Sequence, residues 1–357
     1  LATLAGTYGY TAYGLGLVDV GRIAGTFLDE QSGVNDALLK LMEHDRTTLS
    51  DVCRDEIRAV AGVVPRVVAG YTEMSTERIT SKSVIELRGD LATGLQQITA
   101  PVPGLGQEHG GLLSLGMSID LPALREFYSA RLDALEADPF ECELFADAQS
   151  GVAAGRAALQ KPLPPAVYSF HGFLAVIDDI KGMDIAKKQP PTDIDMRFLL
   201  ASSNAQGLVA MGAMFSPQIA ELDLKPDSKP VKLDLPAGAA PISEAWVAMS
   251  EDALAVSVGA GGAAALTELM TSSAAEPSPF MSMDVDAGRY YGFLGDTLAT
   301  AEPAGADEKA APREVIEATE ELMTSFRDVF DRISFDIQFT ERGVEIPSTM
   351  ALADNDT

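Results

Sequence analysis

The 357-residue sequence is poor in the side chains that carry out most protein chemistry: it contains two cysteines, three histidines and one tryptophan. It is also poor in cations, with 26 lysines and arginines against 53 aspartates and glutamates, which gives a net charge of -27 at pH 7. Binding to nucleic acid without sequence preference requires a basic surface that displaces counterions, and docking on anionic lipid requires one as well. The charge therefore argues against both partners.

Motifs that mark common catalytic and cofactor sites are missing. The sequence has no Gly-x-Ser-x-Gly nucleophile turn, no Gly-x-x-x-x-Gly-Lys phosphate loop and no Asp-x-Asp-x-Asp-Gly calcium loop. The three histidines, His44, His109 and His171, have no cysteine or histidine at metal-ligand spacing. We therefore expect no metal site and no cofactor, and the sequence assigns no catalytic residue.

Long apolar runs are missing too. Residues 1–18 form the longest uncharged stretch, but four glycines and three threonines make it too polar and flexible for a membrane span. We interpret it as a strand or hairpin and predict no membrane span in the chain. The first residue is Leu1 rather than methionine, which leaves room for a signal peptide or an N-terminal lipid anchor outside it.

The two cysteines, Cys53 and Cys142, are both flanked by acidic residues. Acidic neighbours raise the pKa of a thiol, which argues against a nucleophilic thiolate at either position. A disulfide between two helical segments of an extracytoplasmic protein is the preferred interpretation, and two unrelated buried thiols are the alternative.

The sequence does contain a recurring local pattern of a short apolar strand, a polar or glycine turn, and a helix. It is expected at residues 21–42, 112–137, 208–222 and 253–269. Hairpins are predicted at residues 79–98, 245–258 and 333–350, and hairpins imply antiparallel pairing. Further helices are predicted at residues 50–60, 145–159 and 314–332. The predicted fold class is α+β, with antiparallel sheets packed against helices.

A short internal likeness favours two related halves. Residues 117–120 read Met-Ser-Ile-Asp and residues 281–284 read Met-Ser-Met-Asp, which places Asp120 and Asp284 in equivalent positions. Prolines cluster near Pro164, where we place the boundary between an N-terminal α+β half, residues 1–164, and a C-terminal α+β half, residues 165–357. Four further prolines make residues 225–241 a connector that carries a strand.

Methionines are concentrated in the second half. Eight of the 13 lie between residues 183 and 283 and include two close pairs, Met211 with Met214 and Met281 with Met283. Thioether side chains fill irregular cores, and they also make adaptable linings for apolar ligands. These four methionines are therefore the candidate ligand-binding residues, with core filling beneath a sheet as the alternative.

Two histidines support a different class of function. His109 precedes two glycines and His171 lies on an aromatic strand, so each is a candidate base if a carboxylate lies beside it. The alternative function is therefore a hydrolase of unfamiliar type that uses a His/carboxylate pair.

The segment from Trp246 to Tyr291 and the final hairpin around Arg342-Gly343-Val344 resemble uncharacterised bacterial envelope proteins. These are periplasmic or lipoprotein-type chains that carry a domain of unknown function built of repeated hairpin-plus-helix units. The resemblance implies a periplasmic or outer-membrane-associated location and carries over no site residue. Together these observations predict a non-enzymatic binding or scaffold protein of the bacterial envelope, with either a protein partner or an apolar, lipid-like ligand.

Overall fold

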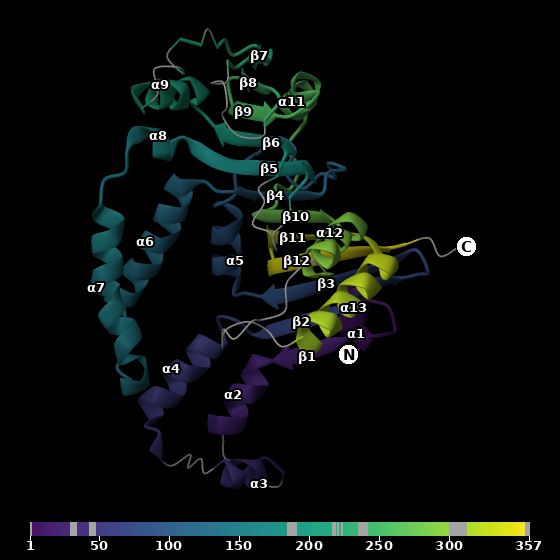
Figure 1. Cartoon of the computed structure of the whole chain (residues 1–357). Helices are drawn as coiled ribbons and strands as arrows, with labels where there is room; N and C mark the ends of the chain where they lie inside the picture. The colour runs from purple at the N-terminus through teal and green to yellow at the C-terminus, as the bar shows by residue number, and fades with distance from the viewer. Residues whose placement is uncertain are drawn as a thin grey trace.

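The computed structural model describes residues 2–28, 34–42, 48–183, 191–215, 219, 221–222, 224–234, 242–299 and 313–353. Within this part, the strands form one antiparallel sheet in the order β1-β2-β3-β12-β11-β10-β4-β5-β6-β9-β8-β7 (Figure 1). The strands are β1 (Gly16–Asp19), β2 (Arg66–Met74), β3 (Arg78–Glu86), β4 (Leu113–Ser118), β5 (Phe170–Lys181), β6 (Asp193–Ser202), β7 (Val231–Lys232), β8 (Ala245–Met249), β9 (Ala253–Val258), β10 (Met281–Asp286), β11 (Phe330–Thr340) and β12 (Gly343–Leu352).

Segments from the two halves of the sequence alternate across this sheet. Strands β1, β2 and β3 continue into β12, β11 and β10, while β4, β5 and β6 continue into β9, β8 and β7. The two central strands, β4 and β10, pair with each other, and Met117 lies directly opposite Met281. Each half of the chain therefore supplies strands to both sides of the sheet, and β3 pairs with a strand more than 250 residues later.

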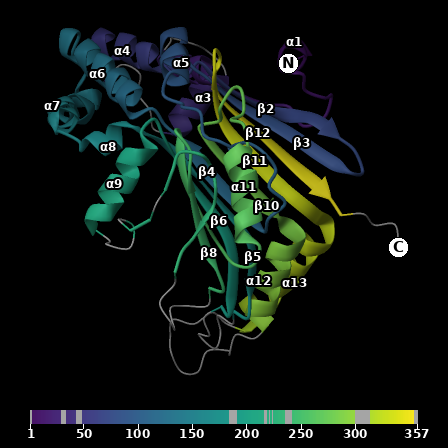
Figure 2. The same cartoon turned by 90° about the horizontal axis from the view of Figure 1, so that it is seen from above.

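Helices lie around the sheet and at its ends. Figure 2 shows α8 and α9 on the opposite side of the sheet from α11, while α12 and α13 lie side by side beyond β10 and β11. The helices are α1 (Ala2–Tyr8), α2 (Val20–Leu28), α3 (Val34–Leu41), α4 (Asp51–Ala61), α5 (Gly89–Gln96), α6 (Leu121–Ala137), α7 (Ala146–Gln160), α8 (Pro165–Tyr168), α9 (Ala205–Phe215), α11 (Gly262–Thr271), α12 (Ala287–Ala299) and α13 (Arg313–Val329).

The α+β class and most of the predicted elements are confirmed. The hairpins β8–β9 and β11–β12 lie where the alternating pattern placed them, and α4, α6, α7, α11 and α13 match predicted helices. Asp120 accepts a hydrogen bond from the amide of Ala123 at 2.8 Å and Ser50 accepts one from Cys53 at 3.2 Å, as helix N-caps do. Residues 225–234 include the short strand β7, while residues 235–241 of the predicted connector lie outside the described residues.

Three strand predictions were wrong, two of them because helix capping prevails over local apolarity. The predicted strand at residues 21–27 is α2, where Asp19 accepts from the amide of Arg22 at 2.9 Å. The predicted strand at residues 208–215 is α9, which begins after Asn204 accepts from the amide of Gly207 at 2.9 Å. The predicted strand or hairpin at residues 1–18 begins with α1 and reaches extended structure only at β1.

A predicted hairpin in the first half was also wrong. Residues 79–98 form β3 followed by α5 rather than two paired strands. Arg88 binds Asp90 at 2.6 Å, and Asp90 also accepts from Arg131 of α6 at 2.7 Å. These ion pairs hold the start of α5 against α6, so the chain leaves the sheet at this point.

Two apolar clusters form the core, and both lie on one face of the sheet. The larger cluster lies between the strands, α11 and the segment around Val102 and Leu105, and the smaller one lies beneath Tyr8 and Tyr10. The strand residues of the larger cluster include Leu174, Val176, Leu199, Ala253 and Ala255, all with at most 2% of their surface exposed. We call this side of the sheet the covered face.

Candidate functional site

The opposite side of the sheet carries a continuous apolar surface, which we call the open face. Its side chains lie directly opposite one another across six neighbouring strands, because each antiparallel pair places them in register. They are Ile333, Phe335, Ile337 and Phe339 of β11; Met281 and Met283 of β10; Leu113, Leu115 and Met117 of β4; Phe173, Ala175 and Ile177 of β5; Met196, Phe198 and Leu200 of β6; and Leu254, Val256 and Val258 of β9.

The open face is partly exposed along its whole width. The side chains named above are half-buried, while Val285, which lies on the same face opposite Ile333 and Leu113, is buried. The residues that alternate with them are mostly buried on the covered face. Strand β4 is a clear case, because Leu113, Leu115 and Met117 are half-buried while Ser114 and Ser118 are buried. Half-burial is expected where neighbouring strands shield the flanks of large side chains but no further layer covers their tips. On β4 the larger apolar side chains therefore lie on the open face, whereas on β5 and β6 large apolar side chains, among them Leu174 and Leu199, also fill the covered face.

Of the described helices, α9 contacts β6 and β9 and lies on the opposite side of the sheet from α11, so it borders the open face at this end (Figure 2). Helix α11 packs on β6, β8 and β9 from the covered side, where Ser257 donates a hydrogen bond to the carbonyl of Gly262 at 2.8 Å. Helix α5 contacts β11 and β12, near the β11–β12 turn where the amide of Leu87 donates to Arg342. Helix α12 contacts β10 and β11, and helix α13 contacts β11. In the order of the strands, β4 and β5 form the middle of the open face.

The four methionines selected from the sequence are in two separate places. Met281 and Met283 belong to the open face, opposite Met117 and Leu115 of β4. Met211 and Met214 lie on α9, which contacts β6 and β9, and they are 38% and 83% exposed. The structure therefore does not bring the two pairs together, and it places none of the four in the fully buried core. Aromatic residues such as Phe173 and Phe198, with ring centroids 6.1 Å apart, contribute more of the apolar surface than the sequence analysis anticipated.

The strict alternation of large apolar with small or polar residues was the signal for this surface. Residues 113–118 read Leu-Ser-Leu-Gly-Met-Ser, and residues 253–258 read Ala-Leu-Ala-Val-Ser-Val. Alternation separates side chains onto two faces of a strand. It does not by itself decide which face the rest of the chain covers.

His109 lies in a glycine-rich segment, residues 104–111, that crosses the covered face. Two arginines hold this segment: Arg197 donates to the carbonyl of His109 at 3.4 Å, and Arg332 donates to the carbonyl of Gly111 at 3.1 Å. A side chain at Gly111 would place its Cβ 2.8 Å from the carbonyl oxygen of Ile177, so glycine is required for this close approach. The segment is therefore fixed as part of the covered face.

Neither histidine has a carboxylate partner in the described part of the chain. The His109 Nε2 atom hydrogen-bonds the carbonyl of Gly104 at 2.9 Å, and burial lowers the pKa of its ring. The two carboxylates whose charges act on the His109 ring form ion pairs with arginines instead: Asp178 with Arg197 at 2.6 Å, and Asp284 with Arg332 at 2.8 Å. His171 is half-buried on β5, and its carbonyl accepts from the amide of Ile119. The hydrogen bonds and ion pairs of His109, Asp178 and Asp284 therefore hold the glycine-rich segment against the strands.

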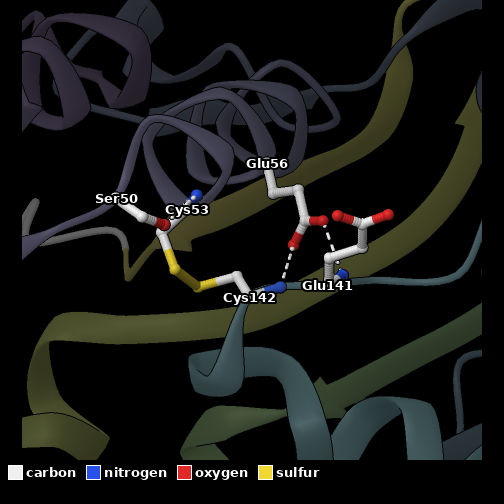
Figure 3. The surroundings of a disulfide bond; sticks show 5 residues. All are labelled: Ser50, Cys53, Glu56, Glu141 and Cys142. Carbon is white, nitrogen blue, oxygen red and sulfur yellow. Dashed lines mark hydrogen bonds between the residues drawn. A yellow bond between two sulfur atoms is a disulfide. The ribbon is translucent and has the colours of Figure 1, made fainter.

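The predicted disulfide between Cys53 and Cys142 is confirmed, and it joins α4 to the segment that precedes α7 (Figure 3). Both cysteines are buried. Glu56 of α4 strengthens the same junction, since its carboxylate accepts from the amides of Glu141 at 2.7 Å and Cys142 at 3.1 Å. The bond links segments 89 residues apart and fastens the helices α6 and α7 to the N-terminal part of the sheet.

Comparison with protein-family models, curated proteins and solved structures gave no match. The resemblance to envelope proteins with repeated hairpin-plus-helix units therefore stays a prediction. Within the described ranges, no helix has both the length and the apolarity needed to cross a membrane.

Proposed function

We propose that this chain is a non-enzymatic binding subunit that holds a partner protein on the open face of its sheet. The observation that carries the proposal is the continuous row of large apolar side chains that are only half-buried on the open face. Leu115, Phe198 and Phe335 are half-buried, whereas Leu174 and Leu199 on the covered face are fully buried. Exposed apolar patches of this extent are unusual on soluble monomers and mark interaction surfaces.

The dimensions of the face favour a protein over a lipid-like ligand. Six strands at a spacing of about 4.8 Å span roughly 24 Å between the outer two. A single acyl chain would cover only one or two strands and leave the remaining side chains in water. A helical or sheet layer packs about 10 Å above a sheet and covers many strands at once. A protein partner can therefore complete the missing layer.

Charge selects among protein partners. The net charge of -27 opposes close approach of a second copy of the same chain, and it attracts a partner with a basic rim around its apolar surface. We therefore propose a partner with net positive charge and an exposed apolar layer.

The disulfide supports an extracytoplasmic location for this interaction. Disulfides persist in oxidising compartments and are rare in the cytosol. Together with the predicted resemblance, this favours the periplasm or the outer-membrane surface of a bacterium.

Site-specific photo-crosslinking in the native host tests the proposal. A photoreactive residue replaces Leu115, Phe198 or Phe335 on the open face, and Glu268 on α11 serves as the control position. We expect one protein to be crosslinked from all three open-face positions and not from position 268. That partner, once purified, should bind the wild-type chain at least tenfold more tightly than Leu115→Asp or Phe335→Asp variants that retain the wild-type circular dichroism spectrum.

Three results would overturn the proposal. Adducts with phospholipid alone would assign the face to a lipid-like ligand, and adducts between two copies of this chain would assign it to self-association. Equal yields from the open-face and control positions would show that the face has no specific occupant.

A further inference from the structure

The covered face has a polar cavity of about 330 Å³ beside the glycine-rich segment. Its floor comes from alternate residues of β10, β11 and β12, and its walls come from residues 106–108 on one side and the start of β3 on the other. The lining contains no aromatic side chain. The apolar clusters flank this region: one lies beneath Tyr8 and Tyr10 and the other beneath Leu105 and α11.

The floor is built from small polar side chains that lie in register. Ser334 lies opposite Thr349 on one side and opposite Asp284 on the other, and Ser282 lies opposite Asp336. Hydroxyl and carboxylate groups therefore replace the valines and leucines that fill the covered face elsewhere. Such a polar row is costly to bury unless water or a ligand satisfies it.

One ion pair fixes the shape of the cavity. Arg332 binds Asp284 with Nε at 2.8 Å and 2.9 Å from the two carboxylate oxygens, and the Asp284 side chain is only 8% exposed. Arg332 also donates to Gly111, which ties the floor to the wall. Glu108 also lies 3.5 Å from the Arg332 guanidinium, so these contacts hold Arg332 in position.

Besides this pair, the lining carries one cation, Arg78, and three carboxylates, those of Glu108, Asp331 and Asp336. Glu108 and Asp331 are exposed, and Glu108 lies 3.5 Å from Arg332, so Asp336 is the least accessible to water of these three carboxylates. The Arg78 guanidinium makes no hydrogen bond or ion pair with any other residue in the described ranges, although the chain carries twice as many acidic as basic side chains. Arg78 on β3 lies opposite Ala351 on β12, which lies opposite Arg332 on β11. Asp336 is four residues after Arg332 on the same strand. Burial raises the pKa of Asp336, while hydrogen bonds to Ser282 and Gln338 act in the opposite direction. Among the residues that the structure describes, none with a basic side chain forms an ion pair with this carboxylate.

We propose that this cavity binds a small zwitterion, with the ligand carboxylate at Arg78 and the ligand ammonium at Asp336. Charge-assisted hydrogen bonds to both ends require one cationic and one anionic partner, as in an α-amino acid or a dipeptide. The absence of an aromatic lining disfavours a sugar ring, and two opposite charges disfavour a simple anion. The volume accommodates either of these zwitterions with some ordered water.

Calorimetric titration of the purified chain tests this site with L-alanine and L-alanyl-L-alanine as probes. N-acetyl-L-alanine lacks the ammonium group and L-alaninamide lacks the carboxylate, and the dipeptide has corresponding capped forms. We expect saturable binding of at least one zwitterion and at least tenfold weaker binding of both its capped forms. Arg78→Gln and Asp336→Asn should each weaken binding of the same zwitterion at least tenfold.

The control variants Arg327→Gln and Asp227→Asn change exposed, paired charges outside the cavity and should leave the affinity unchanged. The proposal is overturned if no probe saturates below about 10 mM. It is equally overturned if the capped forms bind as well as the zwitterions, or if the two cavity variants bind as the controls do. None of these outcomes depends on occupation of the open face.

Discussion

Asp120 and Asp286 occupy equivalent places in the two halves of the chain. Each follows or ends a central strand and caps the next helix: Asp120 accepts from the amide of Ala123 at 2.8 Å, and Asp286 accepts from the amide of Arg289 at 2.9 Å. The sequence likeness paired Asp120 with Asp284 instead. Asp284 is a buried partner of Arg332, so the structural correspondence is two residues further along the chain.

The order of elements supports the same correspondence over most of the chain. In two successive units, one from β2 to β6 and one from β8 to β12, a hairpin precedes the central strand, helices follow it, and a second hairpin ends the unit. The first unit therefore extends past the predicted boundary at Pro164. The first unit contains β2–β3, β4 and β5–β6, and the second contains β8–β9, β10 and β11–β12. Since β3 pairs with β12 and β6 pairs with β9, the two units exchange their outer hairpins within one sheet.

Two consecutive leucines provide a direct test of the two faces of the sheet. Leu199 is fully buried on the covered face, and Leu200 is half-buried on the open face. Leu199→Ala should lower the free energy of unfolding by about 2–5 kcal/mol, because it removes buried contacts and leaves a cavity. Leu200→Ala should cost less, about 1 kcal/mol, since that side chain is only half-buried. Equal losses in urea unfolding would show that the open face is covered.

Removal of the disulfide should lower the stability of the fold, because the unfolded chain then gains conformational entropy. The Cys53→Ser/Cys142→Ser variant frees a loop of 89 residues, which we expect to cost about 2–5 kcal/mol in the free energy of unfolding. Urea unfolding of both proteins with and without reductant measures the effect. Reductant should bring the wild-type midpoint to that of the variant and leave the variant unchanged. A variant as stable as the oxidised wild type would contradict this expectation.

The Asp284–Arg332 pair should contribute more to stability than an exposed ion pair. Asp284→Asn leaves the largely buried Arg332 guanidinium with only the exposed Glu108, at 3.5 Å, as counter-charge, so we expect a loss of about 3–5 kcal/mol. Asp133 pairs with Arg156 on the exposed surface of α6 and α7, and Asp133→Asn should cost less than about 1 kcal/mol. Thermal or urea unfolding of the two variants gives the comparison, and similar losses would contradict it.

Tyr8 should give the folded protein a distinct alkaline transition. Burial and a hydrogen bond to Glu86 raise the pKa of Tyr8 to about 12 from an ordinary value of 10.0. Because the folded-state pKa is the higher one, this contribution to stability is complete below pH 10 and is lost as the pH rises through 12. Urea unfolding between these pH values should show a steeper decline for wild type than for Tyr8→Phe.

The exposed tyrosine Tyr13, 72% accessible, provides the control for that experiment. Tyr13→Phe should follow the wild-type stability profile across the same range. If Tyr8→Phe and Tyr13→Phe declined in parallel with wild type, the hydrogen bond between Tyr8 and Glu86 would not contribute as described.

The sequence by itself determined the local elements and the covalent link. Alternation at residues 333–339 predicted β11, and helical periodicity predicted α4 and α6, because these signals depend on side chains only a few positions apart. The same dependence explains the failures: Asp19 and Asn204 are helix caps, and they convert the apolar segments after them into helices. With only two cysteines in the chain, the disulfide had a single intramolecular pairing.

The tertiary structure alone decided which strands became neighbours and which face was covered. Pairing of β3 with β12 and of β4 with β10 joins segments far apart in the chain, and no local pattern specifies such contacts. Alternation assigned Leu199 and Leu200 to opposite faces, but the packing of α11 and Leu105 determined that Leu199 would be buried. The open face and the polar cavity both arise from that choice, since each consists of residues that the covering segments leave accessible.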